Sequence, residues 1–167
     1  ICDCIKLEGG SDMAPVIKAI VKAGIPVCAH IGLTPQSAAM MGGFKVQGKS
    51  LEAAQELLDS ARAVEEAGAF MVVLEGIPKM LADVITEKLS IPTMGIGAGA
   101  GCDMQVLVAQ DMLGMNEWVP KFVKKYADLH KIIIDAYNQY VKESNERTFP
   151  DHDTQYNAVI EGIENLK

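Results

Sequence analysis

The sequence predicts an α/β fold in which helices cover a parallel β-sheet. Apolar runs typical of strands alternate with helical segments, and about four or five such runs are visible. The clearest run, residues 70–74, is apolar at every position, which is typical of a strand buried on both faces. Glycine or polar residues follow the runs. These observations favour either an open α/β sheet or the later part of a (βα)₈ barrel, since eight βα units need roughly 250 residues.

The first 49 residues are predicted to form two strands, one helix and a long loop. Residues 2–7 and residues 25–30 are mostly apolar and are predicted as strands. Ser11 is a good N-cap, and apolar residues recur at helical spacing as far as Gly24, so we predict a helix between these strands. Residues 31–49 are rich in glycine, proline and methionine and show no clear period.

The next 50 residues repeat the same unit twice. Ser50 is predicted to cap a helix that ends at Gly68, and the buried strand at residues 70–74 follows it. Proline suits the first turn of a helix, so the next helix is predicted at residues 78–89. Residues 91–96 are the last clear strand.

The C-terminal third is predicted to be mainly helical. Residues 106–108 are a candidate for one more strand, and residues 151–167 form a polar tail with a short helix near Val159. We predict a domain over residues 1–150. The helix at residues 120–146 is amphipathic, with Val123, Tyr126, Leu129, Ile132, Ile133, Ala136, Tyr137 and Tyr140 along one stripe.

Composition excludes several classes of protein. The chain has 167 residues, 49% of them hydrophobic, and a formal charge of −7, which argues against a nucleic-acid partner because such binding needs clustered lysine and arginine. No apolar run approaches the roughly 18 residues of a membrane-spanning helix. The four cysteines show no zinc-binding or disulfide spacing, which favours a reducing compartment. Because the chain opens at Ile1 within a predicted buried strand, we expect it to be a processed product or part of a longer chain.

Polar side chains stand at the ends of the predicted strands, where α/β folds collect their functional residues. Lys6 and Glu8 are two positions apart and therefore share a face of their strand, where they could hold a divalent ion and an anionic substrate group, or form a structural ion pair. Glu75 ends the most apolar strand, and partial desolvation suits its carboxylate to proton transfer. His30 is either a substrate contact or a structural histidine. The glycine-rich residues 95–101 would allow contact with a ligand or tight packing.

Several segments of the chain form a recognisable set of motifs. The most specific are residues 26–37, with the sequence PVCAHIGLTPQS, and residues 42–48, with the sequence GGFKVQG. Residues 5–10, 73–78, 95–99 and 120–122 complete the set. In order and spacing these segments resemble the ketopantoate hydroxymethyltransferase family, and the resemblance covers nearly all of residues 1–150. It implies that this chain is the later, C-terminal portion of a (βα)₈ barrel of the TIM type.

The resemblance also implies a reaction, and with it the roles of four residues. The family adds a hydroxymethyl unit from 5,10-methylenetetrahydrofolate to 3-methyl-2-oxobutanoate, the first step of pantothenate biosynthesis. It implies Mg²⁺ at Glu8, substrate binding by Lys6 and His30, and Glu75 as the proton acceptor, with Mg²⁺ stabilising an enolate. It further implies a homo-oligomer that binds small molecules. From charge, hydropathy and cysteine usage we expect no nucleic-acid or membrane partner and a location in the cytoplasm, or in mitochondria if the source is a eukaryote.

This chain departs from the family pattern in two ways. The glycine between Asp103 and Gln105 in the family is Met104 here, a side chain large enough to crowd the glycine loop. The resemblance places two further metal carboxylates and a substrate-binding serine in earlier strands, outside this chain. Two alternatives therefore stay open: another Mg²⁺-dependent enolate enzyme of the barrel type, such as a 2-oxo acid carbon–carbon lyase, or a non-catalytic fragment or interaction subunit.

Overall fold

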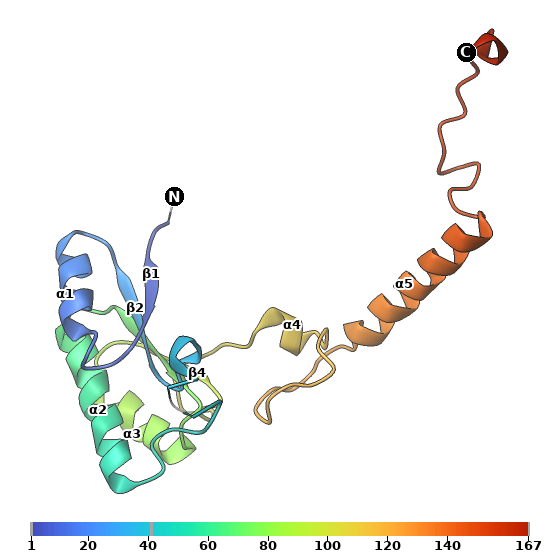
Figure 1. Cartoon of the computed structure of the whole chain (residues 1–167). Helices are drawn as coiled ribbons and strands as arrows, with labels where there is room; N and C mark the ends of the chain where they lie inside the picture. The colour runs from blue at the N-terminus through green and yellow to red at the C-terminus, as the bar shows by residue number, and fades with distance from the viewer. Residues whose placement is uncertain (1, 41, 167) are drawn as a thin grey trace. The chain divides into compact units, whose positions relative to one another are not determined.

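The computed structural model describes residues 2–40 and 42–166 and contains one parallel five-stranded sheet. The strands follow one another across the sheet in chain order, and each pairs in parallel with the next (Figure 1). This order means that each connection moves the chain one strand further in the same direction, as in a barrel. The strands are β1 (Ile5–Glu8), β2 (Val27–Gly32), β3 (Met71–Glu75), β4 (Thr93–Ile96) and β5 (Met104–Gln105).

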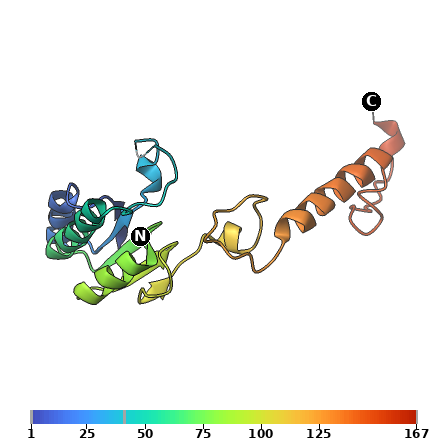
Figure 2. The same cartoon turned by 90° about the horizontal axis from the view of Figure 1, so that it is seen from below.

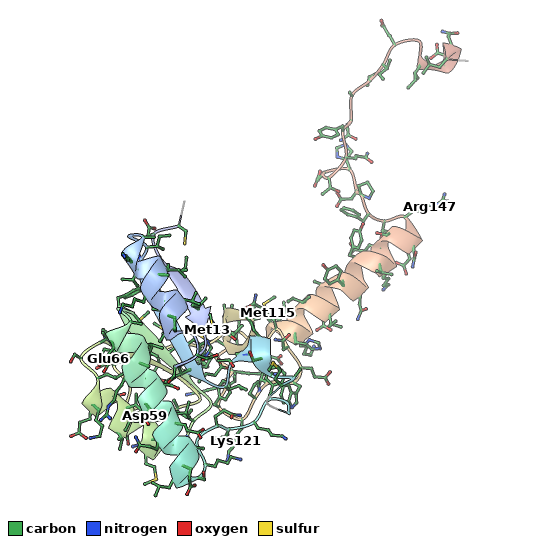
Figure 3. The ribbon with its side chains drawn as sticks, turned by 60° about the vertical axis from the view of Figure 1, so that its left-hand side comes forward. Met13, Asp59, Glu66, Met115, Lys121 and Arg147 are labelled. Carbon is green, nitrogen blue, oxygen red and sulfur yellow. The ribbon has the colours of Figure 1, made fainter. Side chains whose placement is uncertain are left out.

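Three helices cover one face of this sheet. They are α1 (Ala14–Lys22), α2 (Leu51–Glu66) and α3 (Lys79–Lys88), and the two views in Figures 1 and 2 place them on the same side of the strands. Alternate strand residues point toward the helices because side chains alternate along a strand. The exposed Asp59 and Glu66 lie along α2 (Figure 3). The main core between sheet and helices includes Ile17, Val27, Ala29, Ile31, Leu58, Ala61, Val64, Val72, Leu74 and Ile85.

The opposite face of the sheet has a smaller apolar cluster. Cys28, Val73 and Ile96 form it, with Met71 and Met94 packed against them. The polar residues of the strand ends belong to the same face by alternation. The sheet is therefore buried on the helix side. On its other side, this small apolar cluster lies next to the polar residues of the candidate site.

The predicted N-cap of the second helix is confirmed and that of the first is wrong. The Ser50 hydroxyl accepts a hydrogen bond from the Ala53 N–H at 3.2 Å, as an N-cap should. The first helix instead begins at Ala14, after Met13. The Ser11 hydroxyl lies 3.2 Å from the hydroxyl of Ser60 and so ties the first connection to α2.

The strand predicted at residues 106–108 is also wrong, because the pairing occurs earlier. The Asp103 carboxylate accepts hydrogen bonds from the Thr93 N–H at 2.8 Å and from the Thr93 hydroxyl at 3.0 Å. These bonds bring the chain against β4 at once, and β5 is complete by Gln105. The short helix α4 (Ala109–Met112) follows.

The helix predicted over residues 120–146 starts later than expected. It is α5 (Leu129–Glu146), because the N–H groups of Tyr126 and Leu129 donate to the carbonyls of Met112 and Leu113 and hold the preceding segment beside α4. None of the described residues of α5 is buried. Near Val159, the predicted short helix is replaced by a 3₁₀ turn at Ile163–Asn165.

The chain forms two compact units. One contains residues 1–108 with 121–123, and the other contains residues 109–120 with 124–167, including α5, which ends beside Arg147 (Figure 3). The boundary predicted at residue 150 stays a prediction. In the part of the chain that the structure describes, no helix is both long and apolar enough to cross a membrane.

Asp103 makes the stability of the first unit pH-dependent. The hydrogen bonds from the Thr93 N–H and hydroxyl hold the pKa of Asp103 below its usual value. A lowered folded-state pKa stabilises the fold above the unfolded carboxyl pKa of about 3.9, and this contribution is lost as pH falls through the folded-state pKa. At neutral pH we expect the free energy of unfolding to be larger for the parent protein than for Asp103→Asn. Urea titrations should show this difference becoming smaller as the pH drops below about 4.

Asp59→Asn, a change at an exposed carboxylate on α2, is the control for this prediction. A gap between the parent and Asp103→Asn that stays constant from neutral to acidic pH would contradict it.

Candidate functional site

The structure brings the four predicted site residues to one edge of the sheet. Lys6 and Glu8 lie on β1, His30 on β2, and Glu75 is the last residue of β3. Glu8 is the register partner of His30, and Glu75 is the partner of Gly32. Parallel strands end at the same edge, so all four residues reach the carboxyl edge of the sheet.

Lys6, Glu8 and His30 form a connected polar group. The Lys6 ammonium lies 3.2 Å from Glu8 Oε1 and donates to His30 Nδ1 at 2.9 Å. His30 Nδ1 is 3.7 Å from the same Glu8 oxygen. Because Nδ1 accepts from lysine, the imidazole carries its proton on Nε2. The lysine bond therefore fixes which side of the ring donates.

The donating side of His30 faces Glu75. His30 Nε2 and Glu75 Oε2 are 3.0 Å apart. The carboxylate lies out of line with the N–H bond, and across residues 2–40 and 42–166 this buried nitrogen has no aligned hydrogen-bond partner. Buried polar atoms usually have a partner, so Nε2 is a donor available to a ligand that sits beside Glu75.

The site is shielded from water except at the lysine. The side chains of His30, Glu8 and Glu75 are 3%, 8% and 13% exposed, whereas the Lys6 side chain is 49% exposed. Charges interact more strongly in such a low-dielectric setting than in water. An ammonium open to solvent, beside two shielded carboxylates and an imidazole donor, can bind a small anion and move a proton on it.

Sequence reasoning missed one contact to Glu8. The backbone N–H of Gln36 donates to Glu8 Oε2 at 3.0 Å. Gln36 is the middle residue of the 3₁₀ turn Pro35–Ser37. A backbone donor leaves no side-chain signature, so the only signal was its place within the segment of residues 26–37.

The glycine-rich loop packs tightly against neighbouring parts of the protein. A Cβ on Gly97 would lie 2.7 Å from the Phe122 ring, and one on Gly99 would lie 2.6 Å from Lys79 Cγ. A Cβ on Gly101 would collide with the Asp83 carboxylate. The space beside these three glycines is thus filled by the protein itself, so tight packing requires glycine at these positions, and contact of the loop with a ligand stays a prediction.

Two further residues of the sheet have structural roles. Met104 lies in β5 and is 38% exposed, so its side chain has room outside the loop that it was expected to crowd. Cys28 shares the face of His30, and burial raises the pKa of its thiol despite the opposing effect of Lys6. Cys28 therefore stays a neutral thiol in the small apolar cluster next to the site.

Glu8 is the residue best suited to contribute to a metal site. Among residues 2–40 and 42–166, no three histidine, cysteine, aspartate or glutamate side chains gather as metal ligands would. Each Glu8 oxygen takes one N–H donor, and a carboxylate has about four lone-pair positions, so the group retains capacity for a cation. Mg²⁺ commonly uses one or two carboxylates with substrate oxygens and water. Glu8 fits as one such ligand.

Comparisons with known proteins match this chain to one family over most of its length. The family model described as ketopantoate hydroxymethyltransferase matches residues 1–152. Over 147 residues, the chain is 60% identical to a 3-methyl-2-oxobutanoate hydroxymethyltransferase of Clostridium novyi, a match that covers 87% of this chain and 54% of the relative. A protein with the same name from Enterococcus faecalis is 55% identical over 163 residues, which cover 97% of this chain and 59% of the relative.

The chain thus spans little more than half the length of these relatives. The family fold is a TIM barrel, and the consecutive parallel strands β1 to β5 are a portion of it, as predicted. The family match over residues 1–152 and the identities above show that the chain belongs to the ketopantoate hydroxymethyltransferase family.

Proposed function

We propose that the protein transfers a hydroxymethyl unit from 5,10-methylenetetrahydrofolate to 3-methyl-2-oxobutanoate, giving 2-dehydropantoate in the first step of pantothenate biosynthesis. One observation carries the proposal: Lys6, Glu8, His30 and Glu75 converge at one shielded strand edge. The name of the matched relatives supports it.

The charge of each side chain suggests its role in the reaction. The half-exposed Lys6 ammonium would pair with the carboxylate of the 2-oxo acid. Glu75, beside the shielded imidazole, would accept the methine proton of the substrate. The Nε2–H of His30 would donate to a substrate oxygen, which would give this buried nitrogen its missing partner.

Glu8 would be one ligand of Mg²⁺, together with substrate oxygens, water and the carboxylates that the family resemblance places in earlier strands. Bound Mg²⁺ would act as a Lewis acid toward the 2-oxo group, so that charge developing on the enolate oxygen is stabilised. The Gln36 N–H would hold the second Glu8 oxygen and keep the carboxylate oriented.

The carbon–carbon bond follows from proton removal. Transfer of the methine proton to Glu75 leaves an electron pair at the substrate carbon, which forms the new bond to the one-carbon unit. Both bonds from that unit to the folate nitrogens break, and water supplies the hydroxyl oxygen and one hydrogen. The two nitrogens of tetrahydrofolate take up the second hydrogen of water and the proton removed from the substrate. The protein has to hold the nucleophilic carbon of the substrate and the one-carbon donor in line, and this positioning lowers the barrier to reaction.

The decisive experiment measures hydroxymethyl transfer by the protein expressed over its whole reading frame, with and without Mg²⁺, beside this chain alone. We expect Mg²⁺-dependent formation of 2-dehydropantoate by the former. Cleavage of other 2-oxo acids without this transfer would favour the lyase. β1 and β5 are the edges of the sheet here, and exposed sheet edges can pair with another protein chain. A chain that binds such a partner but does not turn over substrate would therefore favour the interaction subunit.

Assembly and location complete the proposal. We propose a homo-oligomer, because α5 presents exposed apolar side chains along its length, including Tyr137, Tyr140 and Val141. We propose the cytoplasm as the compartment, because all four cysteines are free thiols. Light scattering and cell fractionation test these two statements.

Removing the Lys6 ammonium is expected to weaken binding of the 2-oxo acid. Lys6→Met keeps the length of the side chain but deletes a charge-assisted hydrogen bond, so KM should rise about 10- to 100-fold. Lys18→Met, on the exposed surface of α1, is the matched control and should leave KM unchanged. An unchanged KM in Lys6→Met would assign the lysine to structure alone.

A further inference from the structure

The segment that leaves β2 touches the backbone of Glu75. Gly32 ends β2 with a φ of +91°, and a Cβ at this position would lie 2.3 Å from the Glu75 carbonyl oxygen. The same Cβ would lie 2.8 Å from Ile77 Cγ2. Both the left-handed conformation and the close approach require glycine here.

The next residues bind the main chain of Glu75 and the carboxylate of Glu8. The Leu33 N–H donates to the Glu75 carbonyl at 2.8 Å. Three residues later, the Gln36 N–H donates to Glu8 Oε2 at 3.0 Å. Leu33 and Thr34 are both buried, so the first half of the connection between these two bonds is packed inside the protein, whereas Pro35 and Gln36 are exposed.

We infer that residues 32–36 are a positioning element that sets the separation between Glu75 and Glu8, with Gly32 as its critical residue. The inference rests on the proposed function, because it assigns Glu75 to proton transfer. The segment fixes the main chain of the base at one end and the carboxylate of the metal ligand at the other. Neither Gly32 nor Leu33 has to touch the substrate for this.

Gly32→Ala tests the inference in the protein expressed over its whole reading frame. The added methyl group must push the Glu75 carbonyl away and so displace the carboxylate. A shift of about 1 Å in a reacting group costs on the order of 10²-fold in rate, so kcat for exchange of the substrate methine proton with D₂O should fall by about that factor. KM for 3-methyl-2-oxobutanoate should change much less, because Lys6 is not moved.

Gly24→Ala is the matched control. Gly24 has a nearly identical φ of +88°, yet a Cβ there would meet nothing within 4 Å. Both variants carry the backbone strain of alanine in the left-handed region, and only Gly32→Ala adds the collision. Equal exchange rates in the two variants, measured on protein shown to be folded by circular dichroism, would overturn the inference.

Gln36→Pro tests the other end of the segment and decides the matter if Gly32→Ala does not fold. Proline removes the N–H that binds Glu8, and loss of such a supporting bond costs about 10- to 100-fold in metal affinity. Mn²⁺ binding measured by electron paramagnetic resonance should weaken accordingly, and an unchanged Kd would overturn the inference. If the parent itself neither exchanges the methine proton nor transfers hydroxymethyl, the proposed function fails instead.

Discussion

Replacing Glu75 with glutamine is expected to slow exchange of the methine proton of 3-methyl-2-oxobutanoate with solvent by about 10²- to 10⁴-fold. The amide has nearly the shape of the carboxylate but cannot accept the proton. Its oxygen can still lie beside His30 Nε2, 3.0 Å from Oε2 in the parent, so the neighbouring ring should keep its place. Proton nuclear magnetic resonance in D₂O follows the exchange directly and does not require the folate.

Two comparisons make this result specific. Glu66→Gln makes the same chemical change at an exposed position on α2 and should exchange at the parental rate. The KM of Glu75→Gln should stay near that of the parent, since Lys6 is proposed to bind the substrate carboxylate. Exchange at the parental rate in Glu75→Gln would remove this residue from the role of base.

The sequence predicted the strands and the polar strand ends because both depend on local patterns. The apolar run before Glu75 is typical of a buried strand, and two-residue spacing was enough to place Lys6 and Glu8 on one face. In a parallel sheet the strand ends meet, so the neighbourhood of His30 and Glu75 followed once the strands were consecutive. The resemblance supplied the roles, which no spacing could.

What the sequence did not reveal depends on contacts between distant residues. Ser11 looks like an N-cap, but its hydroxyl is engaged by Ser60 on another helix. The strand expected at residues 106–108 lies earlier because the Asp103 carboxylate bonds to Thr93. Gly32 and Gln36 act through their backbone, and a backbone contact leaves no mark on residue type beyond the glycine itself.

Replacing Glu8 with glutamine is expected to weaken binding of Mg²⁺, or of Mn²⁺ as its probe, by at least about 10-fold. Changes to residues that merely support a ligand already cost about 10- to 100-fold in metal affinity, and loss of a ligand's negative charge should cost no less. The amide oxygen can still accept from the Gln36 N–H, so the connection between η1 (Pro35–Ser37) and β1 should survive the change. A weaker affinity for the cation would then be due to the lost charge rather than to a displaced loop.

This measurement separates the two readings of the Lys6–Glu8 pair. If the pair is only structural, Glu8→Gln leaves an ammonium beside a neutral amide, and the free energy of unfolding falls while the Mn²⁺ Kd stays at the parental value. If Glu8 binds the cation, the Kd rises. Glu87→Gln, on the exposed surface of α3, controls for loss of overall negative charge and should leave the Kd unchanged.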